Sequence, residues 1–397
     1  MKKVAIAACS ALMSLSLLAG CGGGGSSSSS GGYYTPGYYG EYNGGASQQT
    51  QELPSQHHDS GDSSNPAVTG SSDVILDSGN GDSAVFSITG EGFGNYREGG
   101  FVTMALKSGA ANIDYGVKTW SGDAVNVYVR GLSSPADAVF SVSLTTNAGA
   151  VVKCPDVVIK PDGLDDNRGG RVFAVFAGST ADSALASYCS KDASDMYEAL
   201  VNYGGFAGWQ AVLLNNNSTT SDIRAAFESI ISSSGITEND TFLFYYSGHG
   251  NENYLAMDSG GMRASEIENY LNQLPSGCHK ILLIDSCSSG TFLPKDFGIF
   301  PEKSIKELSA SIPNLAVMAA CGPKNDAGAS IKLNQSEFTY AMLESLGRTS
   351  PSAAIGSPLS LNRLFDSTLE RTHYNQSDMY GYSYPVFKKT GNDCYIK

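Results

Sequence analysis

From residue 168 to residue 397, short apolar runs alternate with longer amphipathic stretches, and no other feature of the chain limits its possible folds as strongly. Most runs are apolar throughout, as expected for strands that helices cover on both faces. Strands and helices in alternation predict βαβ units and a mostly parallel sheet, that is, an α/β fold. The predicted strands are 171–176, 210–214, 241–246, 280–284 and 315–319, and the predicted helices are 192–202, 221–232, 264–274, 337–346 and 359–371.

Reactive side chains follow two neighbouring apolar runs. His249 comes after the run 241–246, and Cys287 comes after the run 280–284. Open α/β sheets bind ligands at the carboxyl ends of their strands, where both residues are expected. His249 can act as a base near neutral pH, and Cys287 can act as a nucleophile where a nearby cation favours its thiolate. The backbone amides of Gly250 and Cys287 are then expected to bind the oxyanion of a tetrahedral intermediate.

Three sequence blocks resemble those of caspase-like cysteine peptidases, and of metacaspases and their bacterial relatives in particular. They are Tyr-Cys-Ser-Lys-Asp-Ala at 188–193, Tyr-Ser-Gly-His-Gly at 246–250 and Asp-Ser-Cys-Ser-Ser-Gly at 285–290. True caspases carry Gln-Ala-Cys at the nucleophile, whereas Asp-Ser-Cys is the metacaspase form. The resemblance implies a caspase-type fold for residues 168–397, with a mostly parallel sheet flanked by helices and a catalytic dyad of His249 and Cys287.

The same resemblance implies an acidic pocket for the substrate residue that precedes the scissile bond. The matching positions are Cys189, Asp192, Ser247 and Asp285. Two carboxylates in one pocket favour Arg or Lys and repel an acidic side chain. We therefore expect protein or peptide substrates that are cleaved after Arg or Lys. Asp285 has a second interpretation, as a strand-end carboxylate that caps nearby amides.

Residues 71–160 predict a small immunoglobulin-like β-sandwich, because short β-branched and aromatic runs are separated by Gly, Asn and Asp. Residues 87–94 and 117–123 resemble segments of the IPT/TIG immunoglobulin-like family, whose modules bind, brace or space. Trp120 is expected to be a core aromatic residue, and residues 161–167 are interpreted as an interdomain linker. The module is a candidate binder of a protein or a glycan. The strand candidates in it are 84–89, 101–106, 124–129, 138–145 and 151–159.

The N-terminus predicts a lipoprotein signal peptide over residues 1–20. Two lysines precede an apolar stretch that is too short for a comfortable membrane span. The stretch ends in Leu-Ala-Gly-Cys, which resembles a bacterial lipobox and implies lipidation of Cys21; an ordinary signal peptide is the alternative. Residues 21–70, rich in Gly, Ser and Tyr, are expected to form a disordered tether in which the pair His57 and His58 is solvated. The expected location is the bacterial cell envelope, at the outer membrane or cell surface, with membrane contact by the lipid anchor only.

Charge and composition limit the partners and cofactors. The chain carries 25 Lys and Arg against 39 Asp and Glu, a formal net charge of −14. Nucleic-acid-binding proteins show a basic patch or stripe, so nucleic acid is not an expected partner. The sequence requires no cofactor, and its cysteines lack zinc spacing. Metacaspases often need calcium, but Asp258 and Asp296 reproduce no clear family pattern, so calcium stays an open alternative.

Other reactive residues have less specific interpretations. His279 and His373 lie outside the signature blocks and are expected to be surface or hydrogen-bonded histidines. The segment 291–313 contains Lys295, Lys303 and Lys306, and we expect an activation cleavage there because a Lys/Arg-directed pocket is nearby. Four further cysteines either form disulfides, in one of three pairings, or remain buried free thiols. They are Cys154, Cys278, Cys321 and Cys394.

Three classes of function fit these features. The first is a lipid-anchored, caspase-like cysteine endopeptidase with basic specificity. The second is a catalytically silent surface protein that binds a partner through the β module and uses the α/β region as a scaffold. The third is a different cysteine hydrolase on a related fold. The intact His249 and Cys287 and the acidic pocket favour the first.

Overall fold

The computed structural model divides the chain into two compact units, residues 1–58 and 59–397, and every residue it describes belongs to the second. The signal peptide, Cys21 and the His57–His58 pair therefore lie outside the described residues. The prediction of a tether as far as residue 70 was wrong at its end, because Ala67–Gly70 forms strand β1. Described are residues 66–71, 74–76, 83–94, 99–133, 136–161, 163–202, 206–233, 235–294, 308, 311–347, 358–375 and 384–397.

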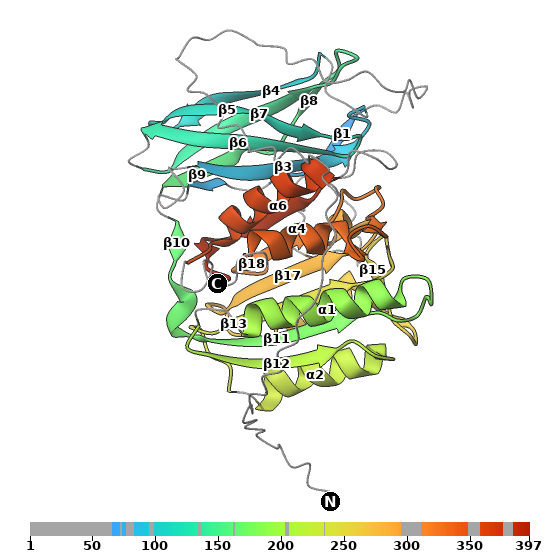
Figure 1. Ribbon diagram of the computed structural model, residues 1–397. Coiled ribbons are helices and arrows are strands. Elements are labelled where there is room, and N and C mark those ends of the chain that lie inside the picture. The colour runs from blue at the N-terminus through green and yellow to red at the C-terminus, as the bar shows by residue number, and fades with distance from the viewer. Residues whose placement is uncertain are drawn as a thin grey trace, which may run out of the picture. The chain divides into compact units, whose positions relative to one another are not determined.

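The C-terminal region is built on a six-stranded sheet, confirming the predicted α/β fold (Figure 1). All five predicted strands are present and run parallel. The sixth, β21, was missed, and it pairs antiparallel with β18 at the edge. Two lysines interrupt the apolar pattern of this strand, and both, Lys388 and Lys389, are buried. In sheet order the strands are β12 (Gly208–Leu214), β11 (Arg171–Gly178), β13 (Thr241–Ser247), β17 (His279–Asp285), β18 (Leu315–Ala319) and β21 (Val386–Thr390).

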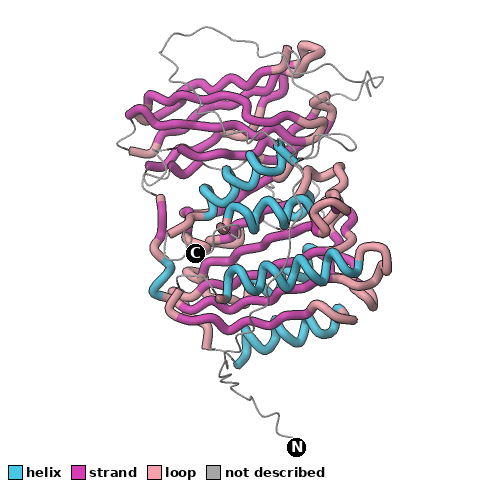
Figure 2. Tube along the Cα trace, in the orientation of Figure 1, coloured by secondary structure: helices cyan, strands magenta, loops and turns pink. Residues whose placement is uncertain are grey.

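Helices cover both faces of this sheet, which explains why its strands are apolar throughout (Figure 2). One core joins α2 and α3 to one face, and the other joins α1, α4 and α6 to the opposite face. All five predicted helices occur, although α1 begins earlier than predicted, so that Cys189 and Asp192 both lie in its first half. The helices are α1 (Ala186–Val201), α2 (Thr220–Ser233), α3 (Ala264–Leu271), α4 (Glu337–Ser345) and α6 (Leu361–Asn375).

Small sheets extend the loops of the α/β region. Strands β14 (Gly250–Asn251), β15 (Tyr254–Ala256) and β16 (Gly261–Arg263) form an antiparallel sheet after β13. Strands β19 (Ala329–Ser330) and β20 (Gln335–Ser336) form a hairpin before α4. Both additions follow strands whose carboxyl ends lie at the same edge, so they build up one side of the molecule.

The N-terminal strands form two sheets that enclose one core, as expected for a β-sandwich. One sheet has the order β1-β3-β6-β5; the other has the order β2-β9-β7-β4, with β8 also paired to β7. Trp120 lies in this core and is 5% exposed, as predicted. Strand β5 was missed because its residues are largely half-exposed and only partly apolar. The strands are β1 (Ala67–Gly70), β2 (Val74–Leu76), β3 (Ser83–Glu91), β4 (Phe101–Ser108), β5 (Asn112–Trp120), β6 (Ala124–Ser133), β7 (Ala138–Thr145), β8 (Val151–Lys153) and β9 (Val157–Pro161).

Strand β3 is buried on both faces because it belongs to the sandwich core and also packs against the α/β region. Phe86 and Ile88 point into the sandwich core, whereas Val85 joins the core beneath α6 and β21. Ser87 lies on the same face of β3 as Val85, and its hydroxyl accepts a hydrogen bond from the backbone amide of Phe387 in β21 at 2.9 Å. Successive side chains of a strand point to opposite faces, so one face of β3 packs in the sandwich core and the other packs against the α/β region.

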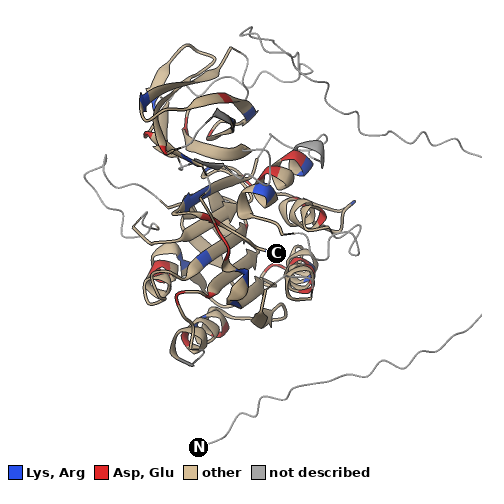
Figure 3. Ribbon diagram, turned by 90° about the vertical axis from the view of Figure 1, so that its left-hand side faces the viewer, with Lys and Arg blue, Asp and Glu red and all other residues tan. Residues whose placement is uncertain are grey.

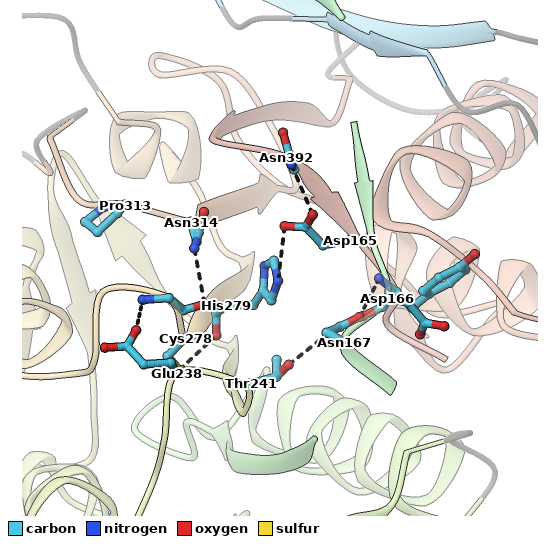
Figure 4. Close-up of polar contacts among 12 residues, drawn as sticks. Asp165, Asp166, Asn167, Glu238, Thr241, Cys278, His279, Pro313, Asn314 and Asn392 are labelled. Carbon is cyan, nitrogen blue, oxygen red and sulfur yellow. Dashed lines mark hydrogen bonds and ion pairs between the residues drawn. The ribbon is translucent and has the colours of Figure 1, made fainter. Parts of the chain in front are cut away.

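The segment predicted as a linker is fixed to the α/β region. Within it, β10 (Leu164–Asp165) pairs in parallel with β22 (Asp393–Cys394). Figure 4 shows Asp165 between Asn392, whose amide donates to it at 3.0 Å, and His279, whose Nε2 lies 3.6 Å from its carboxylate. His279 is 7% exposed, so it is not a surface histidine, and burial lowers its pKa. It begins β17, at the strand end opposite Cys287.

Figure 3 shows charged residues on the helices and also on strands of the α/β region. The six-stranded sheet carries Arg171 in β11, Lys280 and Asp285 in β17, and Lys388 and Lys389 in β21. None of the described helices is both long enough and apolar enough to cross a membrane. Every described cysteine is a free thiol, which favours the second interpretation of Cys154, Cys278, Cys321 and Cys394, as buried free thiols. Those four are all buried.

Asn167 provides a test of the fixed linker. Its side-chain amide donates to Thr241 Oγ1 at 2.9 Å and to the carbonyl of Tyr395 at 3.0 Å, and its oxygen accepts from the Tyr395 amide. Asn167→Ala leaves buried polar groups without partners, so we expect the free energy of unfolding in urea to fall by about 1–3 kcal/mol. Asn392→Ala, at an exposed site in the turn between β21 and β22 whose side chain donates to Asp165 of the linker, should change it by less than about 0.5 kcal/mol. Equal effects of the two variants would contradict a buried role for Asn167.

Candidate active site

Strands β13 and β17 bring His249 and Cys287 to one edge of the sheet. The two strands are parallel, and Ser247 lies opposite Asp285. His249 comes two residues after Ser247, and Cys287 comes two residues after Asp285. The Gly248 amide donates to the carbonyl of Asp285 at 3.1 Å, which ties the two loops together. The chain places β12 on one side of β11 and β13 on the other, so the strand order reverses between β11 and β13. In open α/β sheets, ligand-binding crevices lie beside such a reversal, at the carboxyl ends of the strands.

Gly250 is required where these loops meet. A Cβ at this position would lie 2.3 Å from Ser286 Oγ and 2.6 Å from the carbonyl oxygen of Cys287. No real Cβ is that close to either atom, so only glycine allows the two backbones to approach. The predicted oxyanion pair, Gly250 and Cys287, is therefore in direct backbone proximity.

A pocket of about 80 Å³ opens at this edge, and it brings together residues from distant parts of the chain. His249, Cys287, Cys189 and Asp285, all predicted from sequence, line it. Its other lining residues are Leu185, Gly248, Ser286, Ala327, Gly328, Ala329 and Ser336. The loop 327–329 and Ser336 were not predicted, because they follow β18 and carry no signature residue.

Asp192 and Ser247 are fully buried next to this lining. Ser247 Oγ donates to Asp192 Oδ2 at 2.8 Å, and Ser336 Oγ donates to the same oxygen at 2.5 Å. The Ser336 amide donates to Asp192 Oδ1 at 3.3 Å. Burial raises the pKa of Asp192 to about 6, although these hydrogen bonds oppose the shift.

Asp285 is the second carboxylate of this pair. Its Oδ2 accepts from Thr339 Oγ1 at 2.6 Å and from the Thr339 amide at 3.1 Å. Burial and the negative charge of Asp192 together raise the pKa of Asp285 to about 8. Asp285 lines the pocket and also accepts a hydrogen bond from one backbone amide of α4, that of Thr339, so its position is compatible with both interpretations made from sequence.

The N-terminus of α4 explains how two carboxylates share a buried site. Amides of the first turn of a helix are without intrahelical acceptors, and the helix dipole is positive there. The amides of Ser336 and Thr339 at this end of α4 donate to Asp192 and Asp285 respectively. Hydroxyls and amides thus stabilise the pair, and no Lys or Arg is among the partners that the structure describes for it.

His249 has an acidic partner that sequence reasoning missed. Its Nε2 lies 2.9 Å from Oδ2 of Asp182, which is in the loop after β11. The other oxygen of Asp182 accepts from the Ala184 amide at 2.8 Å, and the hydrogen bond with His249 lowers the pKa of Asp182. The available signal was position alone, since Asp182 follows a predicted strand at the same sheet edge.

The Cys287 thiol is half-buried. It lies 3.9 Å from the carbonyl oxygen of Ala327, toward which it donates. Burial raises the pKa of this thiol, and the negative charge of Asp326 raises it further. The following residue, Ser288, has a left-handed backbone with φ of 53°. A non-glycine residue in this region is strained, and such strain clusters at functional sites.

Residues 175–389, more than half of the chain, match the model of the family described as "Caspase domain". The chain belongs to the caspase-domain family. Metacaspase-1 of Cryptococcus neoformans is 29% identical over 165 residues, which cover 35% of this chain and 34% of that protein. The match thus spans about a third of the length of this curated relative.

Solved structures similar to part of the chain include two that each match more than half of it. Caspase-1 from Spodoptera frugiperda has 14% identity and a TM-score of 0.42, with 58% of this chain and 91% of that chain covered. A protein from Geobacter sulfurreducens has 14% identity and a TM-score of 0.39, with 57% and 94% covered.

Some residues singled out in the sequence lie elsewhere in this caspase-domain chain. Asp258 accepts hydrogen bonds from the amide and hydroxyl of Thr180 and so holds the loop after β11. No group of three or more His, Cys, Asp or Glu that could hold a metal ion occurs within the described residues. The side chain of His373 is outside those residues, as are Asp296, Lys295, Lys303 and Lys306, so the expected activation cleavage stays a prediction.

Replacing Asp326 should make the Cys287 thiol more acidic. Its charge raises the pKa of Cys287, so Asp326→Asn is expected to lower that pKa and increase the thiolate fraction at neutral pH. The rate of alkylation by iodoacetamide, measured against pH, should reach its midpoint at a lower pH than in the unchanged chain. Cys287→Ala supplies the background. A midpoint that stays in place or rises would refute this electrostatic role.

Proposed function

We propose that this caspase-domain protein is a cysteine endopeptidase that cleaves peptide bonds after Arg or Lys. The observation that carries the proposal is the buried pair Asp192 and Asp285 beside the pocket that contains Cys287 and His249. This pair supports basic specificity, and the neighbouring thiol and imidazole support peptide hydrolysis.

The electrostatics of the pair favour a cationic side chain. With the pocket empty, each carboxylate raises the free energy of ionising the other, and burial adds to that effect. A guanidinium or ammonium group stabilises both ionised forms, and a guanidinium can also form two parallel hydrogen bonds. An acidic substrate residue would add a third negative charge, which disfavours cleavage after Asp.

The proposed chemistry uses groups of this chain only. Asp182 holds His249 through Nε2, leaving Nδ1 as the ring nitrogen that takes the proton of Cys287. The thiolate attacks the substrate carbonyl carbon, and the backbone amides of Gly250 and Cys287 bind the resulting oxyanion. His249 returns the proton to the leaving amine, and water then hydrolyses the acyl-enzyme. None of these steps needs a cofactor.

The proposal extends to the location of the protein and its partners. Its support here is the sequence alone, through the lipobox-like segment that ends at Cys21. The protein is anchored by lipid in the bacterial cell envelope and acts on proteins or peptides that carry Arg or Lys. The β-sandwich binds a protein or glycan there, and nucleic acid is not a partner.

Matched fluorogenic peptides that end in Arg, Lys or Asp test this function. The mature chain should cleave the Arg and Lys peptides, with and without calcium, and Cys287→Ala should abolish cleavage. A factor of at least about 10³ between the unchanged chain and Cys287→Ala is expected, because the nucleophile and base act as a unit. Cleavage after Asp would overturn the specificity, and inactivity even after limited proteolysis would favour the binding-protein alternative.

The pH dependence of specificity tests the carboxylate pair by itself. Carboxylates with pKa values of about 6 and about 8 gain negative charge as the pH rises from 6 to 8, so Arg binding should strengthen over this range. The ratio of kcat/KM for an Arg peptide to that for a Gln peptide should rise by up to about tenfold per pH unit, then level off above pH 8. Steps shared by both peptides cancel in the ratio.

Asp285→Asn is the matched variant, since it keeps an oxygen that accepts from Thr339 but removes one charge. This variant should show a lower ratio and a weaker dependence on pH. A ratio that is independent of pH in the unchanged chain would mean that the pair does not bind the substrate cation.

A further inference from the structure

The turn that follows β5 brings one buried carboxylate of the β-sandwich into contact with a loop of the caspase domain. Asp123 is 3% exposed. Its Oδ2 accepts from the backbone amide of Lys324 at 2.8 Å, and its Oδ1 accepts from the side-chain amide of Asn325 at 2.6 Å. A Cβ on Gly322 would lie 2.3 Å from Oδ2, so the loop backbone is packed directly against the carboxylate.

The same loop contacts the nucleophile segment from its other side. The carbonyl of Asn325 accepts from the amide of Ser288, the residue after Cys287, at 2.8 Å. Ala327, two residues further on, lines the pocket and lies next to the Cys287 thiol. Asn325 therefore links Asp123 to the backbone that carries the nucleophile.

The turn holds the carboxylate in place. Ser121 Oγ donates to Asp123 Oδ1 at 3.0 Å, and the Ser121 hydroxyl also accepts from the Ala124 amide at 3.1 Å. An ion pair also supports the loop, because Lys324 pairs with Glu91 at the end of β3. Polar groups of the sandwich thus converge on Lys324 and Asn325 of the active-site loop, and Gly322 packs against one of these groups, the Asp123 carboxylate.

We propose that Asp123 is a positioning residue, through which the β-sandwich holds the loop 322–328 in the shape that the pocket and Cys287 require. The proposal rests on the proposed peptidase function, and it makes the sandwich part of the catalytic unit rather than a spacer. A carboxylate suits this role because its two oxygens satisfy a backbone amide and a side-chain amide at once. Loss of these bonds frees Asn325, and the Ser288 amide then loses its fixed acceptor.

The test compares two variants of the full mature chain at the same interface. Asp123→Ala removes the contact with the active-site loop. Lys118→Met is the control, because Lys118 in β5 pairs with Asp366 and Glu370 of α6, away from that loop. For the Arg peptide, Asp123→Ala should lower kcat by about 10- to 100-fold, since small displacements of reacting groups are costly. KM should change little in Asp123→Ala, and Lys118→Met should keep both constants.

Hydrogen exchange supplies a readout that does not depend on activity. In Asp123→Ala, the Ser288 amide and the loop 322–328 should exchange about tenfold faster, as expected when one hydrogen bond is lost. The core strands β13 and β17 should keep their protection, which separates local loosening from general destabilisation. If Asp123→Ala fails to fold, Asn325→Ala replaces it, because this change removes only the side-chain donor.

Exchange also separates this proposal from the proposed function. A wild-type chain that cleaves no peptide would refute the peptidase function, yet faster Ser288 exchange in the Asp123 variant would still support the positioning role. Unchanged exchange at Ser288 in a folded Asp123→Ala chain would overturn that role. An equal loss of kcat in Lys118→Met would also overturn it, because the interface as a whole would then account for the effect.

Discussion

Parallel pairing between β13 and β17 is the constraint on which the active site depends. The register places Ser247 opposite Asp285, and the hydrogen bond from Gly248 to Asp285 holds the two strand ends together. A shift of one residue would turn each of these side chains to the other face of the sheet. The pocket, the acidic pair and the close approach of Gly250 to Cys287 all follow from this register.

Burying two carboxylates next to each other is energetically unfavourable, and several hydrogen-bond donors offset part of this cost. The N-terminus of α4, the hydroxyls of Ser247 and Ser336, and both donors of Thr339 face the pair. These donors leave the pKa of Asp285 still raised to about 8, because burial and the charge of Asp192 outweigh them. Carboxyl groups perturbed in this way beside a pocket are more typical of functional sites than of stabilising ion pairs.

The β-sandwich is joined to the α/β region by contacts that a simple spacer would not need. Strand β3 is buried on both faces, and the segment after β9 pairs with the C-terminal strand β22. Through Asp123 the sandwich also contacts the loop beside Cys287. Strand β3 of the sandwich is buried on both faces, and the polar turn that holds Asp123 is buried against the loop beside Cys287. Both features require that the two regions fold against each other.

The sequence by itself determined the five parallel strands and the five helices of the α/β region and most strands of the sandwich, and it placed the reactive side chains at strand ends. It could do so because apolar periodicity is local, and because Asp285 ends its strand while His249 and Cys287 come two residues after theirs. Tertiary structure alone decided which distant groups surround them. Asp182 is 67 residues from His249, Thr339 is 54 from Asp285, and Asn325 is 202 from Asp123. Hydrogen bonds over such separations leave no periodic trace in the chain, since each depends on where two loops meet after the sheet has formed.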